Sequence, residues 1–143
     1  MKLSTIQLAN ILTYCGTLPL IACVFLQVVP MSGFDSNLIA KTYAAIIISF
    51  LCGIHLAAHL FFAEKCPRNL LLTSNAVALL AWSSLLIPNQ QIATLLQVLC
   101  FVYLLILDLK LRAAGILPKW FYALRRNATA IVVSSLIAIT VLS

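Results

Sequence analysis

The sequence is short of charged residues, and above all of acidic ones. Its 143 residues include nine lysines and arginines but only three acids, so that 8% of the chain is charged while 64% is hydrophobic. A soluble domain carries charge on roughly a quarter of its residues. Most of this chain's surface is therefore expected to face hydrocarbon, which predicts an integral membrane protein.

The same scarcity excludes several kinds of function. Asp35, Glu64 and Asp108 form no carboxylate pair at a usable spacing, the four glycines form no phosphate-binding loop, and no nucleophile lies beside a base. We therefore predict no enzyme activity, no catalytic residue and no cofactor. The net charge of +6 does not indicate nucleic-acid binding, because the basic residues lie at the ends of apolar runs, where they determine topology. The five cysteines lack metal-ligand spacing and are expected to be reduced.

Five apolar stretches are long enough, or nearly so, to cross roughly 30 Å of hydrocarbon at about 1.5 Å per residue. They cover approximately residues 7–29, 39–63, 69–87, 92–109 and 128–142. Between the last two, Gly115 is suited to end one helix and Pro118 to begin another, so a short amphipathic helix at about 118–126 is predicted to lie on the inner leaflet. The predicted fold is all-α: a single domain, residues 1–143, forming a polytopic bundle of five transmembrane helices with one interfacial helix.

Lysine and arginine are distributed unevenly among the segments that flank these spans. All but Lys41 lie in the N-terminal arm, which contains Lys2, or in the second and fourth loops. The positive-inside rule then places the N-terminus in the cytoplasm, and five spans place the C-terminus outside. No Arg-rich, Ser-rich transit peptide is present, and the lipoprotein-like "LIAC" at 20–23 continues into an apolar run. We expect an unprocessed multi-pass protein of a bacterial inner membrane with a periplasmic C-terminus.

Polar side chains gather in the cytoplasmic half of the predicted spans. His55 and His59 lie one turn apart near the inner end of the second span, and Asp108 closes the fourth span at the same face. The other members of this half are Asn10, Tyr14 and Asn75. Buried ionisable groups in a membrane are costly and usually face a partner in the bundle interior. These six residues are the candidates for a polar pocket that binds a small molecule or a proton.

The two histidines admit more than one interpretation. Hydrogen bonding to a neighbouring helix is the simplest, and proton or ligand binding is the second. A histidine pair one turn apart is also found in zinc sites, and Asp108, Glu64 or Cys66 would then supply a third ligand. We predict no metal site; if one existed, His55 and His59 would be its weak candidates.

Aromatic and basic residues near the span ends are predicted to anchor the chain at the membrane interfaces. Trp82 lies near the outer end of its span, and Trp120, Arg125 and Arg126 lie in the inner loop, where the arginines would meet lipid phosphates. Binding of a membrane-protein partner through the same face is the alternative. The lipid bilayer is the partner that the sequence establishes most directly.

The stretches "YCGTLPL", "SFLCGIH", "LAWSSLLIP" and "LDLKLRAAGILPKWFYALRR" resemble the DUF3429 family of small membrane proteins, which includes the eukaryotic transmembrane protein 69. The resemblance covers nearly the whole chain, and its most specific parts are Gly53–His55 and the run from Asp108 to Trp120. The family pattern continues with tryptophan where this chain has Leu56, and it does not include His59. The resemblance implies a five-span helical bundle of unknown function, with His55 and Asp108 as the candidate pair for its polar site.

Two functions remain open. We favour a non-enzymatic membrane component that supports a partner or complex, because the chain is small and has no large soluble domain. The alternative is a small-molecule or proton-handling protein that uses the polar pocket around His55 and Asp108. Five-helix ligand-binding membrane proteins such as the translocator-protein family support that alternative by analogy of architecture alone.

Overall fold

A computed structural model describes residues 4–143, so that Lys2, which contributed to the predicted orientation, lies outside the described residues. The described residues form helices joined by short turns, as the all-α prediction from the sequence requires. Its elements are α1 (Thr5–Val28), α2 (Ser36–Phe62), the short 3-10 helix η1 (Ala63–Lys65), α3 (Leu70–Ser84), α4 (Gln90–Ala113) and α5 (Lys119–Leu142). Side-chain oxygens of Ser4, Asp35, Asn69 and Asn89 cap the first four α-helices, which explains where each begins.

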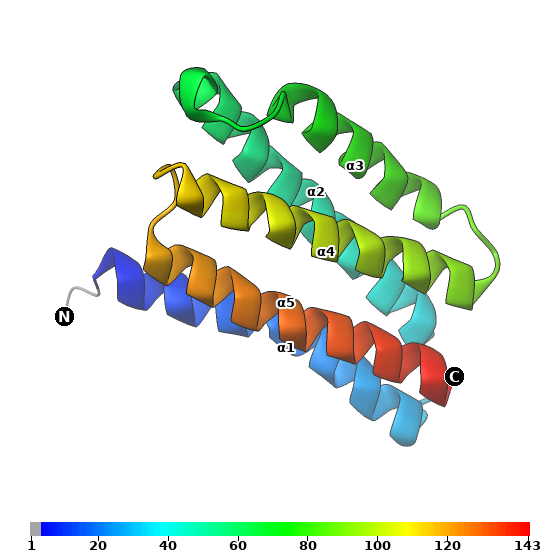
Figure 1. Cartoon of the computed structure of the whole chain (residues 1–143). Helices are drawn as coiled ribbons and strands as arrows, with labels where there is room; N and C mark the ends of the chain where they lie inside the picture. The colour runs from blue at the N-terminus through cyan, green and yellow to red at the C-terminus, as the bar shows by residue number, and fades with distance from the viewer. Residues whose placement is uncertain (1–3) are drawn as a thin grey trace.

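The helices lie side by side as a bundle, with α4 between α3 and the α1–α5 pair in the view of Figure 1 and with α2 crossing behind α4. α2 contacts all four of the other α-helices. The described N-terminal residues and the C-terminus lie at opposite ends of the bundle (Figure 1). Four helices, α1, α2 with η1, α4 and α5, are long and apolar enough to cross a membrane. The chain is therefore a membrane protein, and the part of it that the structure describes contains four helices of spanning length.

The third predicted span, 69–87, is shorter as a helix than the sequence suggested. α3 has 15 residues and ends at Ser84, so it rises only about 22 Å. The Ser84 hydroxyl donates a hydrogen bond to the carbonyl of Ala81, and the backbone N–H groups of Leu85 and Leu86 bond back into the last turn. Residues 85–87 consequently form a turn before Pro88 rather than continuing the helix.

The interfacial helix predicted at 118–126 is wrong as a separate element. Residues 119–126 are the first two turns of α5, which runs without interruption to Leu142. No glycine or proline occurs after Pro118 to break it, and Leu124, Arg125 and Ala128 are buried on one face across the predicted boundary. The turn before α5 is as predicted: Gly115 ends α4 with φ 81°, a conformation that glycine adopts without strain, and Pro118 precedes the first turn of α5.

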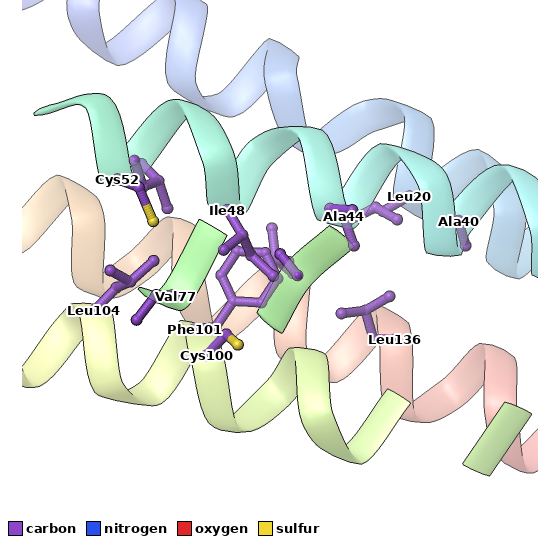
Figure 2. Packing of buried hydrophobic residues seen from close by; sticks show 14 of the residues in the cluster. Leu20, Ala40, Ala44, Ile48, Cys52, Val77, Cys100, Phe101, Leu104 and Leu136 are labelled. Carbon is purple, nitrogen blue, oxygen red and sulfur yellow. The ribbon is translucent and has the colours of Figure 1, made fainter. Parts of the chain in front are cut away.

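The main core fills the centre of the bundle (Figure 2). Ala40, Ala44 and Ile48 line one face of α2, and Phe101 of α4 packs among them with Leu136 of α5. Small residues at helix contacts let the backbones approach closely, which is a common basis for helix association in membranes. This packing fixes the rotation of α2, α4 and α5, and it therefore determines which polar side chains face inward.

Gln97, Lys41 and Ser84 form a connected polar network at the end of the bundle that contains the α3–α4 turn. Gln97 is fully buried on α4, and its amide donates to the carbonyl of Lys41 at 2.8 Å and to the Ser84 hydroxyl at 3.0 Å. The Lys41 ammonium donates to the carbonyl of Ile87 at 3.0 Å. These contacts tie α2, α3 and the α3–α4 turn to α4, so that this end of the bundle is a structural joint.

Candidate functional site

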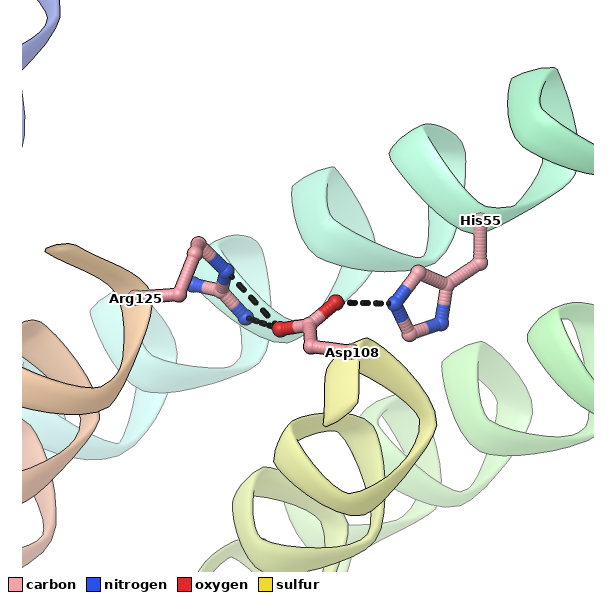
Figure 3. A network of polar contacts seen from close by, with 3 residues as sticks. All are labelled: His55, Asp108 and Arg125. Atoms are coloured by element: carbon pink, nitrogen blue, oxygen red, sulfur yellow. Dashed lines mark hydrogen bonds and ion pairs between the residues drawn. The ribbon is translucent and has the colours of Figure 1, made fainter. Parts of the chain in front are cut away.

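Three ionisable side chains from three helices meet inside the bundle (Figure 3). His55 of α2, Asp108 of α4 and Arg125 of α5 are 1%, 1% and 8% exposed. His55 Nε2 lies 2.7 Å from Asp108 Oδ1, while Arg125 Nε and Nη2 each lie 3.1 Å from Asp108 Oδ2. We call His55, Asp108 and Arg125 the buried triad.

The local sequence explains why these side chains converge. Asp108 lies near the end of α4, and the Gly115–Pro118 turn reverses the chain so that the second turn of α5 returns to the same depth. Arg125 therefore reaches Asp108 although 17 positions separate them. His55 lies two turns before the end of α2, on the face that also buries Cys52 and Ala58. Each member of the triad is thus held by a different helix.

Hydrogen bonding determines where the protons of the triad reside. An ionised carboxylate only accepts hydrogen bonds, so beside ionised Asp108 the His55 Nε2 atom carries a hydrogen and donates a hydrogen bond to Asp108 Oδ1. With a neutral imidazole, the charges of Asp108 and Arg125 cancel and the triad has no net charge. Within residues 4–143, His55 Nδ1 is buried and has no hydrogen-bond partner. The triad therefore carries no net charge, and its one remaining basic nitrogen, His55 Nδ1, makes no hydrogen bond within the described residues.

The other predicted pocket residues do not join the triad by hydrogen bonds. His59 is half-buried, and its Nδ1 accepts from the N–H of Leu70 at 3.3 Å. Asn75 is exposed and donates to the carbonyl of Leu71. Tyr14 is also exposed, and its hydroxyl accepts from Asn127, while Asn10 lies half-buried one turn earlier on α1. The compact pocket expected from six residues is thus reduced to His55 and Asp108.

Arg125 is the member of the site that the sequence interpretation placed wrongly. It was predicted to lie at the interface beside Arg126, but it is buried against Asp108, whereas Arg126 is exposed. The sequence does contain a signal, because Arg125 precedes the buried Ala128, Thr129 and Val132 by three, four and seven positions, which is the spacing of one helix face. Exposed Trp82 and half-buried Trp120 remain predicted interface anchors.

The side chains considered for a metal site are not assembled around one. In the portion of the chain described, no three histidine, cysteine or acidic side chains gather to hold a metal ion. His55 faces Asp108, and His59 faces the start of α3. Burial raises the pKa of the Cys66 thiol, which opposes the thiolate form that binds metals, and Glu64 is exposed in η1.

A groove of about 470 Å³ lies beside the triad, between α1, α2 and α5. The buried residues Phe101 and Val132 form its floor, and its rim carries Leu12 and Phe50, which are 62% and 70% exposed. Exposed apolar side chains of a membrane protein face lipid, so the groove opens sideways into the hydrocarbon. Arg125 also lines it, so this residue belongs both to the groove and to the triad.

Two of the hydroxyl groups that line the groove are engaged with the backbone. The Thr17 hydroxyl donates to the carbonyl of Tyr14, and the Tyr43 hydroxyl donates to the carbonyl of Gly16, both at 2.7 Å. Arg125 differs, because its Nε and Nη2 contact Asp108 while its Nη1 has no hydrogen-bond partner among the residues that the structure describes. The site can therefore offer an N–H donor of Arg125 to a bound molecule in a channel whose lining is mostly apolar.

A family model described as protein of unknown function (DUF3429) matches residues 5–141, nearly the whole chain and every member of the triad. No curated protein and no solved structure gives a match.

Proposed function

Because the chain belongs to the DUF3429 family, whose function is unknown, we propose a function from its own contacts. It is a non-enzymatic integral membrane protein that takes up a small amphipathic molecule from the bilayer. The observation that carries this proposal is the groove of about 470 Å³ with a buried arginine in its wall. Ligand pockets in proteins are typically about 300–1,000 Å³, mostly apolar, with a few polar groups that fix orientation.

The orientation of the groove fits an amphipathic occupant. Along α5 the groove extends from Phe121 to Val132, which corresponds to roughly 16 Å of helix, and Arg125 lies near one end of that length. In the proposed topology this end is close to the inner surface, while the Val132 end reaches toward the bilayer centre. A molecule with a polar head and an apolar chain would therefore lie parallel to the lipids of the inner leaflet.

Filling the groove tests this function directly. Gly16 lines the groove, and a Cβ added there meets no atom within 4 Å, so Gly16→Leu is expected to occupy the binding space without disturbing the helix contacts. We expect native mass spectrometry of gently extracted wild-type protein to reveal a bound small molecule, and Gly16→Leu to lose most of it. Gly53→Leu is the matched control, because Gly53 is also helical and free of nearby atoms but lies on an exposed face outside the groove.

Retention of the bound molecule by Gly16→Leu, or equal loss from Gly53→Leu, would argue against the groove as the binding site. Wild-type protein that carries no molecule, and that takes up none when offered single-chain amphiphiles, would contradict the function itself.

The proposed topology has five spans, with α3 and its flanking turns as the third crossing. The described termini at opposite ends of the bundle support an odd number of crossings. The basic residues of the α2–α3 connection, of the last turn of α4 and of the first turns of α5 support a cytoplasmic N-terminus in a bacterial inner membrane. We expect alkaline phosphatase fused after Ser143 to be active and green fluorescent protein fused there to be dark. Fusions in the α3–α4 turn, after Pro88, provide the control and should behave as the C-terminal ones do. Fluorescence from the C-terminal fusion would exclude this topology.

Support of a partner complex is the second candidate function. Lys119 and Arg126 are exposed at the inner end of α5, where a partner protein could contact them without occupying the groove. Reversing both charges to glutamate is expected to weaken in-cell crosslinking to a specific membrane protein at least severalfold. Reversal of the exposed Lys65 and Arg68 changes the charge of the same side equally and serves as the control. Equal crosslinking by both double variants would rule out this surface.

A further inference from the structure

Building on the proposed function, we infer the class of ligand: a single-chain amphiphile whose head is a monoanionic oxyacid, bound at Arg125 together with one proton on His55. Three features support this inference, and they are independent of the groove's volume. They are the unused donors of Arg125, the charge balance of the triad, and the unpartnered nitrogen of His55.

The guanidinium of Arg125 has a second edge available. Its Nε and Nη2 contact a single oxygen, Asp108 Oδ2, while Nη1 has no hydrogen-bond partner in residues 4–143. A guanidinium presents five N–H donors in a planar fork, and oxyacid anions bind such an edge through two parallel hydrogen bonds. Because Arg125 lines the groove, a head that accepts hydrogen bonds at this edge would place its chain in the apolar channel.

The charge balance then requires a proton. Asp108 already neutralises Arg125, so an anion added beside a neutral His55 would leave the buried cluster with one net negative charge. An uncompensated charge inside a membrane protein is strongly unfavourable. Protonation of His55 restores neutrality, since imidazolium and guanidinium then balance Asp108 and the bound head. Anion and proton are therefore expected to bind one to one.

His55 is placed to take that proton. Nε2 already donates to Asp108, so the buried Nδ1 is the basic nitrogen that remains, and it has no partner in the described chain. The charged groups that face the imidazole are Asp108 from α4 and, through it, Arg125 from α5. α3 contains no titratable residue, and on α2 the nearest ones are Cys52 and His59, one turn away on either side. The proton on Nδ1 is thus governed by the triad and by whatever occupies the groove.

The binding of defined probes to purified, detergent-solubilised full-length protein tests the inference. Hexadecanesulfonate is the main probe, because it stays a monoanion over the whole range and any pH dependence therefore belongs to the protein. As the pH is lowered, its affinity is expected to rise by up to tenfold per pH unit, because one proton accompanies each bound anion, and to level off once His55 is protonated without ligand. Hexadecanol, which is neutral, should bind more weakly and without pH dependence. Methanesulfonate has the head without the chain and should not bind detectably.

Matched variants assign the effect to residues. His55→Gln keeps an N–H for Asp108 but cannot take a proton, so the sulfonate affinity should fall and lose its pH dependence, while His59→Gln should behave as the wild type does. Arg125→Gln should lose sulfonate binding and keep hexadecanol binding, with Arg126→Gln as its control. Should a variant fail to fold, the wild-type pH profile of sulfonate against hexadecanol still decides.

The outcomes separate the two proposals. If hexadecanol binds as tightly as the sulfonate and Gly16→Leu abolishes both, the headgroup inference is overturned while the binding function stands. If sulfonate binding is independent of pH, the coupled proton is overturned. If no amphiphile binds, both proposals fail.

Discussion

Exchange of Asp108 for alanine is expected to lower the free energy of unfolding by about 3–5 kcal/mol, because it leaves a buried charge without its counter-ion. Arg125 would stay protonated at 8% exposure with no acceptor for Nε or Nη2, and His55 would lose the acceptor of its Nε2 proton. The change also removes the contacts by which Asp108 links α4 to α2 and α5. Reversible unfolding in mixed micelles with increasing denaturing detergent measures this free energy.

Asp35→Ala is the matched control for that experiment. Asp35 is an exposed acid of the same type that caps the start of α2 by accepting from the N–H of Leu38. Loss of such a cap costs about 1 kcal/mol. A destabilisation by Asp108→Ala no larger than that of Asp35→Ala would mean that the triad is not buried in the membrane-embedded protein.

The sequence was sufficient to bring two members of the triad to the same depth. The uneven distribution of lysine and arginine predicted a direction for each span, and from this His55 and Asp108 were predicted to lie at the same end of the bundle without any knowledge of packing. Their contact at 2.7 Å depends on the rotation of α2 and α4, which composition does not determine. The end of α4 at Gly115 and the start of α5 at Pro118 were also predicted from the sequence, because both depend on the local backbone properties of single residues.

The errors arise where neighbouring residues of one type have opposite environments. Arg125 and Arg126 are about 100° apart around α5, so only one of them can face Asp108. Which one does so is decided by Leu124, Ala128 and Val132, whose burial rotates the helix. The two adjacent charges suggested a helix lying at the surface and a span that begins after it. In the structure one continuous helix carries a buried charge and an exposed charge in consecutive positions.

Removing all three members of the triad together is expected to have a very different effect from removing one. A variant with His55→Leu, Asp108→Leu and Arg125→Leu contains no unpaired buried charge, and apolar replacements of buried ion pairs are often neutral or stabilising by about 1–4 kcal/mol. We expect its unfolding free energy to equal or exceed that of the wild type in the same mixed-micelle experiment, although Asp108→Ala alone is strongly destabilised. Reorientation of the helices is resisted by the main core around Phe101, which the three substitutions leave unchanged.

This variant separates stability from function. If the apolar bundle is stable but no longer binds an anionic amphiphile, the triad is retained for the ligand and costs the fold stability, as is common for ionisable groups placed inside membranes. If the apolar bundle is instead as unstable as Asp108→Ala, the triad acts as a specific joint between α2, α4 and α5, and the groove needs another source of specificity. Since the two results predict opposite shifts in unfolding free energy for the triple variant, one comparison with Asp108→Ala distinguishes a binding site from a structural clasp.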